Sequence, residues 1–213
     1  MKQIPLNLSY RTWRTRDDFC VSDCNAEAVA WIDKCPDWPS VGVLIVGEPG
    51  SGKTHLAAIF SENRIEAADL TEPFLPTRTD RMAVENAERL SDERTLLHLL
   101  NFMNERGGRV LLTASRPPAV SLPDLQSRLN SFPQIRLRMP DENLVRAVLA
   151  HEFQVRHIMP DDAVLDYAVM RLPRSYAMVH QAVWLADRVS LEGKKGVTIP
   201  VMKQVLENLK KEE

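Results

Sequence analysis

The sequence has few of the features that mark secreted, membrane-spanning or nucleic-acid-coating proteins. Its three cysteines, Cys20, Cys24 and Cys35, form neither an even disulfide set nor a paired metal motif. There is no apolar run of about eighteen residues and no apolar signal core at the N-terminus. The formal net charge is -2, without the basic stripe of a nucleic-acid-binding surface. We therefore expect a cytoplasmic protein with reduced thiols.

The composition is that of an ordinary soluble globular protein. Hydrophobic residues make up 44% of the 213 residues and charged residues 26%. This length suffices for one α/β domain and a small appendage.

The stretch VGVLIVGEPGSGKTHLAAIF, residues 41–60, identifies the chemistry. Residues 47–54 match the phosphate-binding pattern G-x-x-x-x-G-K-[ST] directly after an apolar strand and before a helix. The loop residues are Gly47, Glu48, Pro49, Gly50, Ser51, Gly52, Lys53 and Thr54.

Each residue type in this loop suits a bound phosphate. Glycines let the backbone N–H groups converge on phosphate oxygens. Lys53 is expected to neutralise β- and γ-phosphate charge and Thr54 to ligate Mg²⁺, at the positive end of the following helix. The sequence predicts a site for a nucleoside di- or triphosphate.

A second segment, residues 81–90, begins with an apolar run that ends in Glu85-Asn86. In P-loop NTPases a strand end of this kind supplies an acidic residue for Mg²⁺ and often a second one that orients the attacking water. Glu85 suits Mg²⁺, unless the pair merely ends an ordinary strand. Asn86 cannot accept a proton, and losing a general base costs roughly 10²–10⁴-fold in rate. We therefore predict slow or absent hydrolysis by this site.

The remaining pattern predicts an α/β domain followed by helices alone. Further strands are expected at 64–70, 109–115 and 134–139, and helices at 25–33, 91–106 and 122–129. After Pro140 the expected helices are 141–156, 161–172, 175–191 and 200–209. We predict a tail (1–16), a three-layer αβα nucleotide-binding domain with about five parallel strands (17–139) and a helical lid domain (140–213).

The tail contains Gln3-Ile4-Pro5-Leu6-Asn7-Leu8, in which two leucines alternate. Such a segment either frays as a terminus or docks through its leucines into the groove of a partner.

Together these segments resemble the AAA+ module of the bacterial replication initiator DnaA, and most closely the DnaA-related Hda branch of that family. The segments that carry the resemblance are Asp18-Phe19 with Val21 and Asn25, GEPGSGKTHL (47–56), Glu85-Asn86, LLTASRPP (111–118) and LPDLQSRL (122–129). His55 after the loop and the Arg116-Pro117-Pro118 turn are typical of this branch.

The resemblance implies residue roles. Arg128 takes the position of the arginine finger, which acts in trans on a neighbour's nucleotide. Gln3, Leu6 and Leu8 match a sliding-clamp-binding peptide. The implied nucleotide contacts outside the loop are Phe19, Val21, Asn25, His55 and a first sensor that is either Thr113 or Ser115. The lid arginine of the family falls on Met178 here, with Arg174 one turn earlier as its possible substitute.

The resemblance also implies a function. The expected protein binds ADP or ATP with Mg²⁺ and, on the sliding clamp, stimulates ATP hydrolysis by DnaA, which prevents re-initiation of replication. Homo-oligomers are a further expected assembly. No helix-turn-helix segment follows the last predicted helix, so we expect no sequence-specific DNA binding. The alternatives are a helicase loader or other self-sufficient ATPase, and a small-molecule P-loop kinase.

Overall fold

The structure is a computed structural model that describes residues 16, 19–71, 79–193 and 196–209. The chain divides between Met139 and Pro140 into two compact units, which are described separately below. Among the described residues, no helix combines the length and the apolar character needed to cross a membrane.

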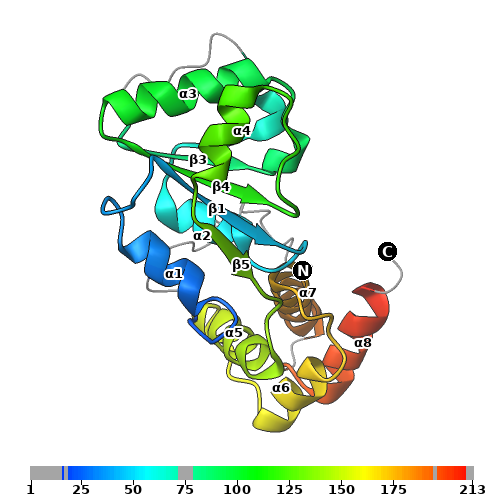
Figure 1. The fold of residues 1–213 in the computed structure, drawn as a ribbon. Helices are drawn as coiled ribbons and strands as arrows, with labels where there is room; N and C mark the ends of the chain where they lie inside the picture. Colours follow the sequence, from blue (N-terminus) through cyan, green and yellow to red (C-terminus); the bar gives the residue numbers. More distant parts are fainter. Residues whose placement is uncertain (1–15, 17–18, 72–78, 194–195, 210–213) are drawn as a thin grey trace. The chain divides into compact units, whose positions relative to one another are not determined.

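The first unit is built on a parallel sheet (Figure 1). In the described part of the chain its five strands lie in the order β2-β3-β4-β1-β5, and every neighbouring pair is parallel. The strands are β1 (Gly42–Gly47), β2 (Arg64–Glu66), β3 (Arg81–Glu85), β4 (Arg109–Ala114) and β5 (Gln134–Leu137). Because all strands run the same way, their carboxyl ends share one edge of the sheet. The predicted α/β architecture is confirmed.

Helices cover both faces of this sheet (Figure 1). Leu44 of β1 belongs to the apolar cluster that includes α3 (Glu93–Glu105) and α4 (Pro123–Asn130). Its neighbours Val43 and Ile45 belong to the opposite cluster, with α1 (Ala26–Asp33) and α2 (Lys53–Phe60). A strand buried on both faces has no polar side to present, which explains the uninterrupted Val43-Leu44-Ile45-Val46 run.

Helix α3 shows how the local sequence specifies an element. Leu96, Leu99, Leu100 and Met103 recur at helical spacing and are fully buried against the sheet. The carboxylate of Asp92 accepts hydrogen bonds from the backbone N–H of Arg94 (2.9 Å) and of Thr95 (3.2 Å). This cap satisfies N–H groups that the first turn leaves without partners.

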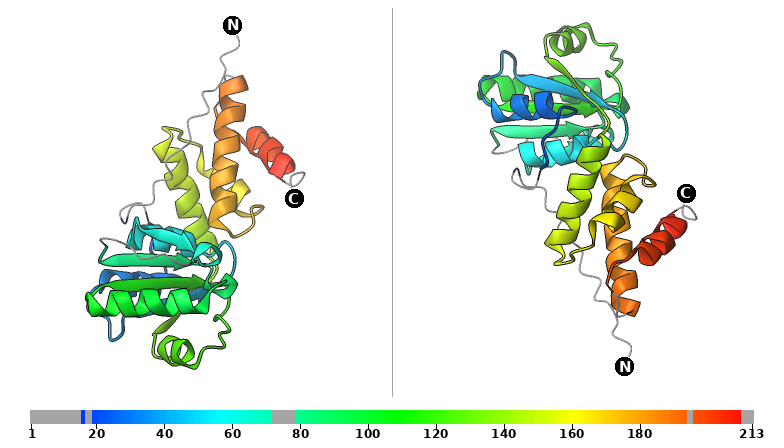
Figure 2. Two further views of the ribbon diagram at one scale, coloured as in Figure 1. Left: turned by 90° about the horizontal axis from the view of Figure 1, so that it is seen from above. Right: turned by 90° about the horizontal axis from the view of Figure 1, so that it is seen from below.

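The second unit contains four helices within its described residues: α5 (Glu142–Val155), α6 (Asp162–Val169), α7 (Tyr176–Gly193) and α8 (Ile199–Leu209). Helices α5 and α7 lie side by side (Figure 2). Their common core includes Leu149 and Phe153 of α5, Val183 of α7 and Met202 of α8, all fully buried.

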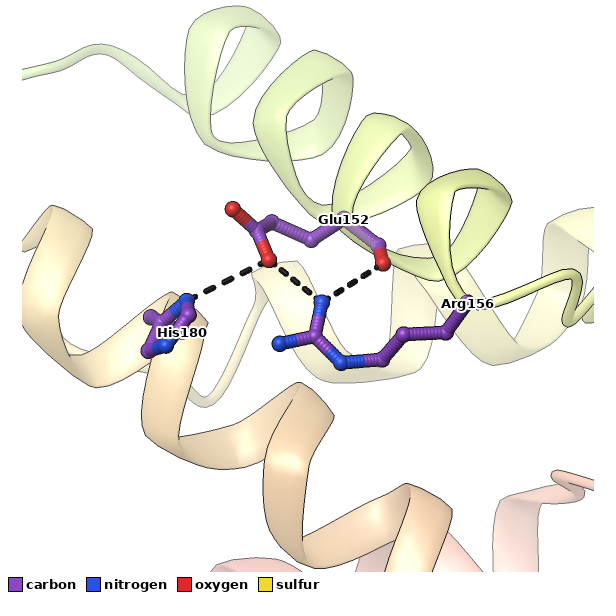
Figure 3. Close-up of polar contacts among 3 residues, drawn as sticks. All are labelled: Glu152, Arg156 and His180. Carbon is purple, nitrogen blue, oxygen red and sulfur yellow. Dashed lines mark hydrogen bonds and ion pairs between the residues drawn. The ribbon is translucent and has the colours of Figure 1, made fainter. Parts of the chain in front are cut away.

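A polar network joins α5 to α7 at the margin of this core (Figure 3). Glu152 Oε2 accepts a hydrogen bond from Arg156 Nη1 at 2.5 Å and lies 3.2 Å from His180 Nδ1. The Arg156 side chain is only 3% exposed, so its charge depends on this carboxylate for compensation. Burial by itself raises the pKa of Glu152, but the contacts with His180 and Arg156 outweigh it and lower the pKa to about 2.

One predicted strand ends earlier in the structure than in the sequence pattern. Strand β2, expected to continue to residue 70, stops at Glu66 and is followed by the 3₁₀ turn η1 (Ala67–Asp69). Strand β3 ends at Glu85, where its apolar run was predicted to end, and the second boundary leads into η2 (Ala87–Arg89). At the second boundary Asn86 has φ 56°, a left-handed conformation that Asn tolerates and that cannot continue a strand.

Candidate nucleotide site

The loop between β1 and α2 has the geometry of a phosphate cradle. Gly52 precedes α2 with φ 102°, a conformation that residues with a Cβ rarely adopt. At Gly47, a Cβ would lie 2.6 Å from the carbonyl oxygen of Leu137 and 2.7 Å from Ser51 Oγ. The loop therefore requires small residues for its close packing as well as for its turns.

Lys53 occupies the centre of this loop. Its Nζ donates hydrogen bonds to the carbonyl oxygens of Gly47 (2.7 Å) and Glu48 (2.9 Å). Burial lowers the pKa of Lys53, and the negative charge of Glu88 opposes that effect. The ammonium group is thus held among neutral carbonyls, and a bound phosphate would give it the counter-charge that it lacks.

Two hydroxyls of the loop fit a bound nucleotide. Ser51 Oγ is buried and, among the described residues, has no hydrogen-bond partner. A buried polar atom without a partner is costly, and a phosphate oxygen would satisfy it. Thr54, the first residue after Lys53 in α2, is exposed and free to ligate a Mg²⁺ ion. The residues present therefore fit a Mg²⁺–nucleotide, whose metal would neutralise charge on the β- and γ-phosphates.

The predicted metal ligand Glu85 is buried at the carboxyl end of β3 and is already ion-paired. Its Oε1 accepts a hydrogen bond of 3.1 Å from Nη1 of Arg64 on β2. The next residue, Asn86, donates through Nδ2 to Oε2 of Glu66, also on β2, at 2.7 Å. Both side chains of the Glu85-Asn86 pair are therefore tied to the edge strand of the sheet.

The sequence interpretation missed Glu88. This residue lies on η2, directly after Glu85-Asn86 in the chain, and contacts the end of β4 rather than β2. Its carboxylate accepts hydrogen bonds from Ser115 N (3.1 Å) and Ser115 Oγ (2.5 Å), just beyond β4. The strand was expected to end at Glu85-Asn86, but no sequence pattern predicted that the turn after it would bring Glu88 next to Ser115. The acidic residue three positions after Glu85 was the available signal.

The two candidates for the first sensor differ in their surroundings. Thr113 is 1% exposed within β4 and pairs in register with Ile45 of β1. Ser115 lies one residue past the end of β4 and binds Glu88. Of these two candidates, only Ser115 is exposed at the edge of the sheet where the strands have their carboxyl ends.

The segment before α1 reaches the P-loop helix through one ring contact. Phe19 is buried and meets His55 of α2 edge to face, with ring centroids 4.9 Å apart. Asn25 is buried and shapes the preceding turn, because its side chain accepts from Ser22 N and donates to Cys20 O. Val21 is 50% exposed, so it is available for contact with a ligand.

Arg128 lies at the opposite edge of the sheet. It lines a polar pocket of about 590 Å³ together with Ser40 and Val41, which precede β1, whereas the P-loop follows β1. The pocket is lined by Pro39, Ser40, Val41, Leu97, Asn101, Asn104, Asp124, Ser127, Arg128 and Ser131. The half-buried guanidinium of Arg128 has no hydrogen-bond or ion-pair partner among the described residues.

Arg174 belongs to the helical unit, where it forms an exposed ion pair with Glu142 at 2.5 Å. Met178 packs against the core of that unit. The predicted partner-binding residues Gln3, Leu6 and Leu8 lie outside the described residues.

The chain resembles known proteins at two levels. No family model matches it. It is 29% identical over 186 residues to an uncharacterized protein of Haemophilus influenzae. The aligned region covers 76% of this chain and 80% of that protein.

Its fold is that of solved AAA+ proteins. Domain III of the replication initiation protein DnaA from Thermotoga maritima superposes with a TM-score of 0.76 at 17% identity, over 92% of this chain and 96% of that one. The parallel sheet with the P-loop after β1 therefore defines an AAA+ P-loop NTPase fold.

Two further structures share this fold. AMPPCP-bound DnaA from Aquifex aeolicus has a TM-score of 0.69 at 17% identity, over 84% of this chain and 67% of that one. The Holliday junction branch migration motor RuvB from Thermotoga maritima has a TM-score of 0.68 at 17% identity, over 92% of this chain and 72% of that one.

Proposed function

We propose that this chain binds ADP or ATP, with Mg²⁺, at its P-loop. Support comes from the unpartnered hydroxyl of Ser51, the buried ammonium of Lys53 and the exposed hydroxyl of Thr54. Glu85 completes the metal site once its ion pair with Arg64 opens. The Aquifex aeolicus DnaA that shares the fold is bound to AMPPCP, an adenine nucleotide analogue.

We further propose that Arg128 acts on the nucleotide of a second AAA+ molecule. The observation that carries this proposal is the position of its unpaired guanidinium, at the amino edge of the sheet. A strand of six residues such as β1 spans about 20 Å, so Arg128 is far from the P-loop of its own chain. An arginine that supplies positive charge to a neighbour's γ-phosphate accelerates hydrolysis by roughly 10³–10⁵-fold.

The second molecule is DnaA, and the chain is a negative regulator of replication initiation of the Hda kind. The DnaA-like fold supports this assignment, as do the sequence segments shared with the DnaA/Hda family. In this mechanism Gln3, Leu6 and Leu8 tether the protein to the DNA polymerase sliding clamp, and Arg128 then converts DnaA-bound ATP to ADP.

The test is ATP hydrolysis by purified cognate DnaA in the presence of DNA-loaded clamp and this protein. Wild type is expected to accelerate hydrolysis, and Arg128→Ala to lose most of that acceleration, roughly 10³-fold or more. Arg94→Ala is the control, because Arg94 is an exposed arginine in the first turn of α3 and does not line the Arg128 pocket. Equal acceleration by wild type and Arg128→Ala would refute the role of Arg128.

Failure of wild type to accelerate DnaA, with clamp binding verified, would remove the regulator assignment. The alternative is then a helicase loader or a self-sufficient AAA+ ATPase. That alternative predicts robust ATP turnover by the chain's own site.

A further inference from the structure

Glu88 lies at the same edge of the sheet as the P-loop. Its carboxylate is fixed by two hydrogen bonds from Ser115, which directly follows Ala114 of β4. Ala114 pairs in register with Val46, the residue before Gly47. Neighbouring strands lie about 4.8 Å apart, so Ser115 holds Glu88 one strand away from the start of the phosphate loop.

The charges of Glu88 and Lys53 influence each other without contact. Burial raises the pKa of Glu88, but the hydrogen bonds from Ser115 and the charge of Lys53 outweigh it, so the pKa lies below its ordinary value. Glu88 in turn raises the pKa of Lys53, against the larger effect of burial. The two side chains form no ion pair with each other, because Lys53 donates to the carbonyl oxygens of Gly47 and Glu48 and Glu88 accepts from Ser115.

Two other carboxylates at this edge are engaged elsewhere, and a third, Glu48 of the loop itself, is exposed. Glu85 is paired with Arg64, and Glu66 is bound to Asn86. Glu66 also lies on β2, three strands from β1 in the sheet order, a separation of about 14 Å. Among Glu66, Glu85 and Glu88, Glu88 is therefore the carboxylate best placed to act on a nucleotide at Lys53.

We propose that Glu88 is the general base for hydrolysis of ATP bound to this chain's own P-loop, in place of the carboxylate missing at Asn86. The proposal rests on the nucleotide binding proposed above. In this step the oxygen of a water molecule bonds to the γ-phosphorus, and the bond from that phosphorus to the β,γ-bridging oxygen breaks. ADP leaves with the electron pair, and the Glu88 carboxylate accepts the proton of the water.

The surroundings of Glu88 also predict that this hydrolysis is slow. The hydrogen bonds from Ser115 stabilise the ionised carboxylate, and a carboxylate whose pKa is lowered is a weak base. The resulting enzyme turns over its own nucleotide slowly, and its ATP and ADP states are long-lived.

The experiment is single-turnover hydrolysis of Mg-ATP by the full chain, with Lys53→Ala as the background. Glu88→Gln is expected to lower the rate at least about 100-fold, while the affinity for fluorescent mant-ADP stays within about twofold of wild type. Glu66→Gln, the matched loss of a carboxylate from the same edge, is expected to hydrolyse at the wild-type rate.

A pH profile separates chemistry from mere positioning. Ser115→Ala removes the hydroxyl that stabilises ionised Glu88, which raises the pKa of that carboxylate. The acid limb of the rate profile is therefore expected to move to higher pH. This variant keeps the Glu88 side chain, so the test does not depend on whether Glu88→Gln folds.

The proposal would be overturned by wild-type hydrolysis no faster than that of Lys53→Ala, by a wild-type rate in Glu88→Gln, or by an equal loss of rate in Glu66→Gln. A loss of Mg²⁺-dependent affinity at an unchanged rate would assign Glu88 to the metal instead and would also overturn it. Failure of the proposed function has a different signature, because then mant-ADP does not bind or DnaA is not stimulated.

Discussion

Arg64 and Glu85 form an ion pair of 3.1 Å between neighbouring strands, with the Glu85 side chain 7% exposed and the Arg64 side chain 32% exposed. The buried carboxylate thus depends on a partner from the edge strand, which itself is only three residues long. The pair therefore joins β2 to β3 and compensates the negative charge of Glu85, the predicted metal ligand.

Removal of Arg64 is expected to destabilise the first unit. Arg64→Ala leaves the buried Glu85 carboxylate without its counter-charge, and we expect the free energy of unfolding to fall by about 1–2 kcal/mol, a value reduced from that of fully buried pairs because Arg64 is partly exposed. Urea denaturation measures this change. Arg64→Gln combined with Glu85→Gln should recover most of the loss, and additive losses in the double variant would contradict the pairing.

Removal of the Lys53 ammonium is expected to abolish tight nucleotide binding. In Lys53→Ala the phosphates lose the only positive charge among loop residues 47–54, and we expect the Kd for mant-ADP to rise at least about 100-fold. Lys34→Ala removes an exposed lysine near the Trp31 ring and is the control. Unchanged affinity in Lys53→Ala would place the nucleotide elsewhere.

Gly47 is expected to tolerate no side chain. In Gly47→Ala the new Cβ meets the backbone oxygen of Leu137, which cannot move without distorting β5. We expect a loss of about 1–3 kcal/mol in the free energy of unfolding and weaker mant-ADP binding. Gly196→Ala, where a Cβ would meet nothing within 4 Å, is the control and should melt at the wild-type temperature.

The network of Glu152 predicts a pH dependence for the helical unit. The pKa of Glu152 falls from an ordinary 4.5 to about 2 in the folded chain. A lowered pKa in the folded state stabilises that state above the unfolded pKa, so this contribution disappears as the pH falls from about 4.5 to about 2. The protection factors of the α5 and α7 amides, which are exchange rates corrected for the intrinsic rate at each pH, should fall over this range.

Glu152→Gln is expected to remove that acid sensitivity while lowering protection at neutral pH. The exposed Glu142→Gln serves as the control, because Glu142 pairs with Arg174 on the surface of the same unit. A pH dependence that persists unchanged in Glu152→Gln would show that another group causes it.

The sequence was informative where a local pattern decides the outcome. The apolar strand before the P-loop and the helix after it depend on neighbouring residues, and they were predicted at the positions where the structure has them. The helices after Pro140 were predicted for the same reason, since their apolar repeats are local.

Contacts between distant segments could not be predicted in this way. Whether Glu85 meets a metal ion or Arg64 depends on the order of strands in the sheet, which no local pattern encodes. Glu88 was missed because its position depends on the left-handed turn at Asn86 and on a contact with Ser115, which is distant in the sequence, and neither has a hydrophobic period. The molecule on which we propose that Arg128 acts likewise cannot be identified from a local sequence pattern.

The separation of Arg128 from the P-loop gives the first unit two unlike ends. One end receives a nucleotide and the other presents an arginine, so two copies cannot satisfy each other through a two-fold axis at these sites. Any row of such units is directional, with a free loop at one terminus and a free arginine at the other, unless it closes into a ring. If the chain acts as proposed, one copy of it placed with Arg128 against the exposed nucleotide site at the end of a row would terminate that row, so each row would need a single copy.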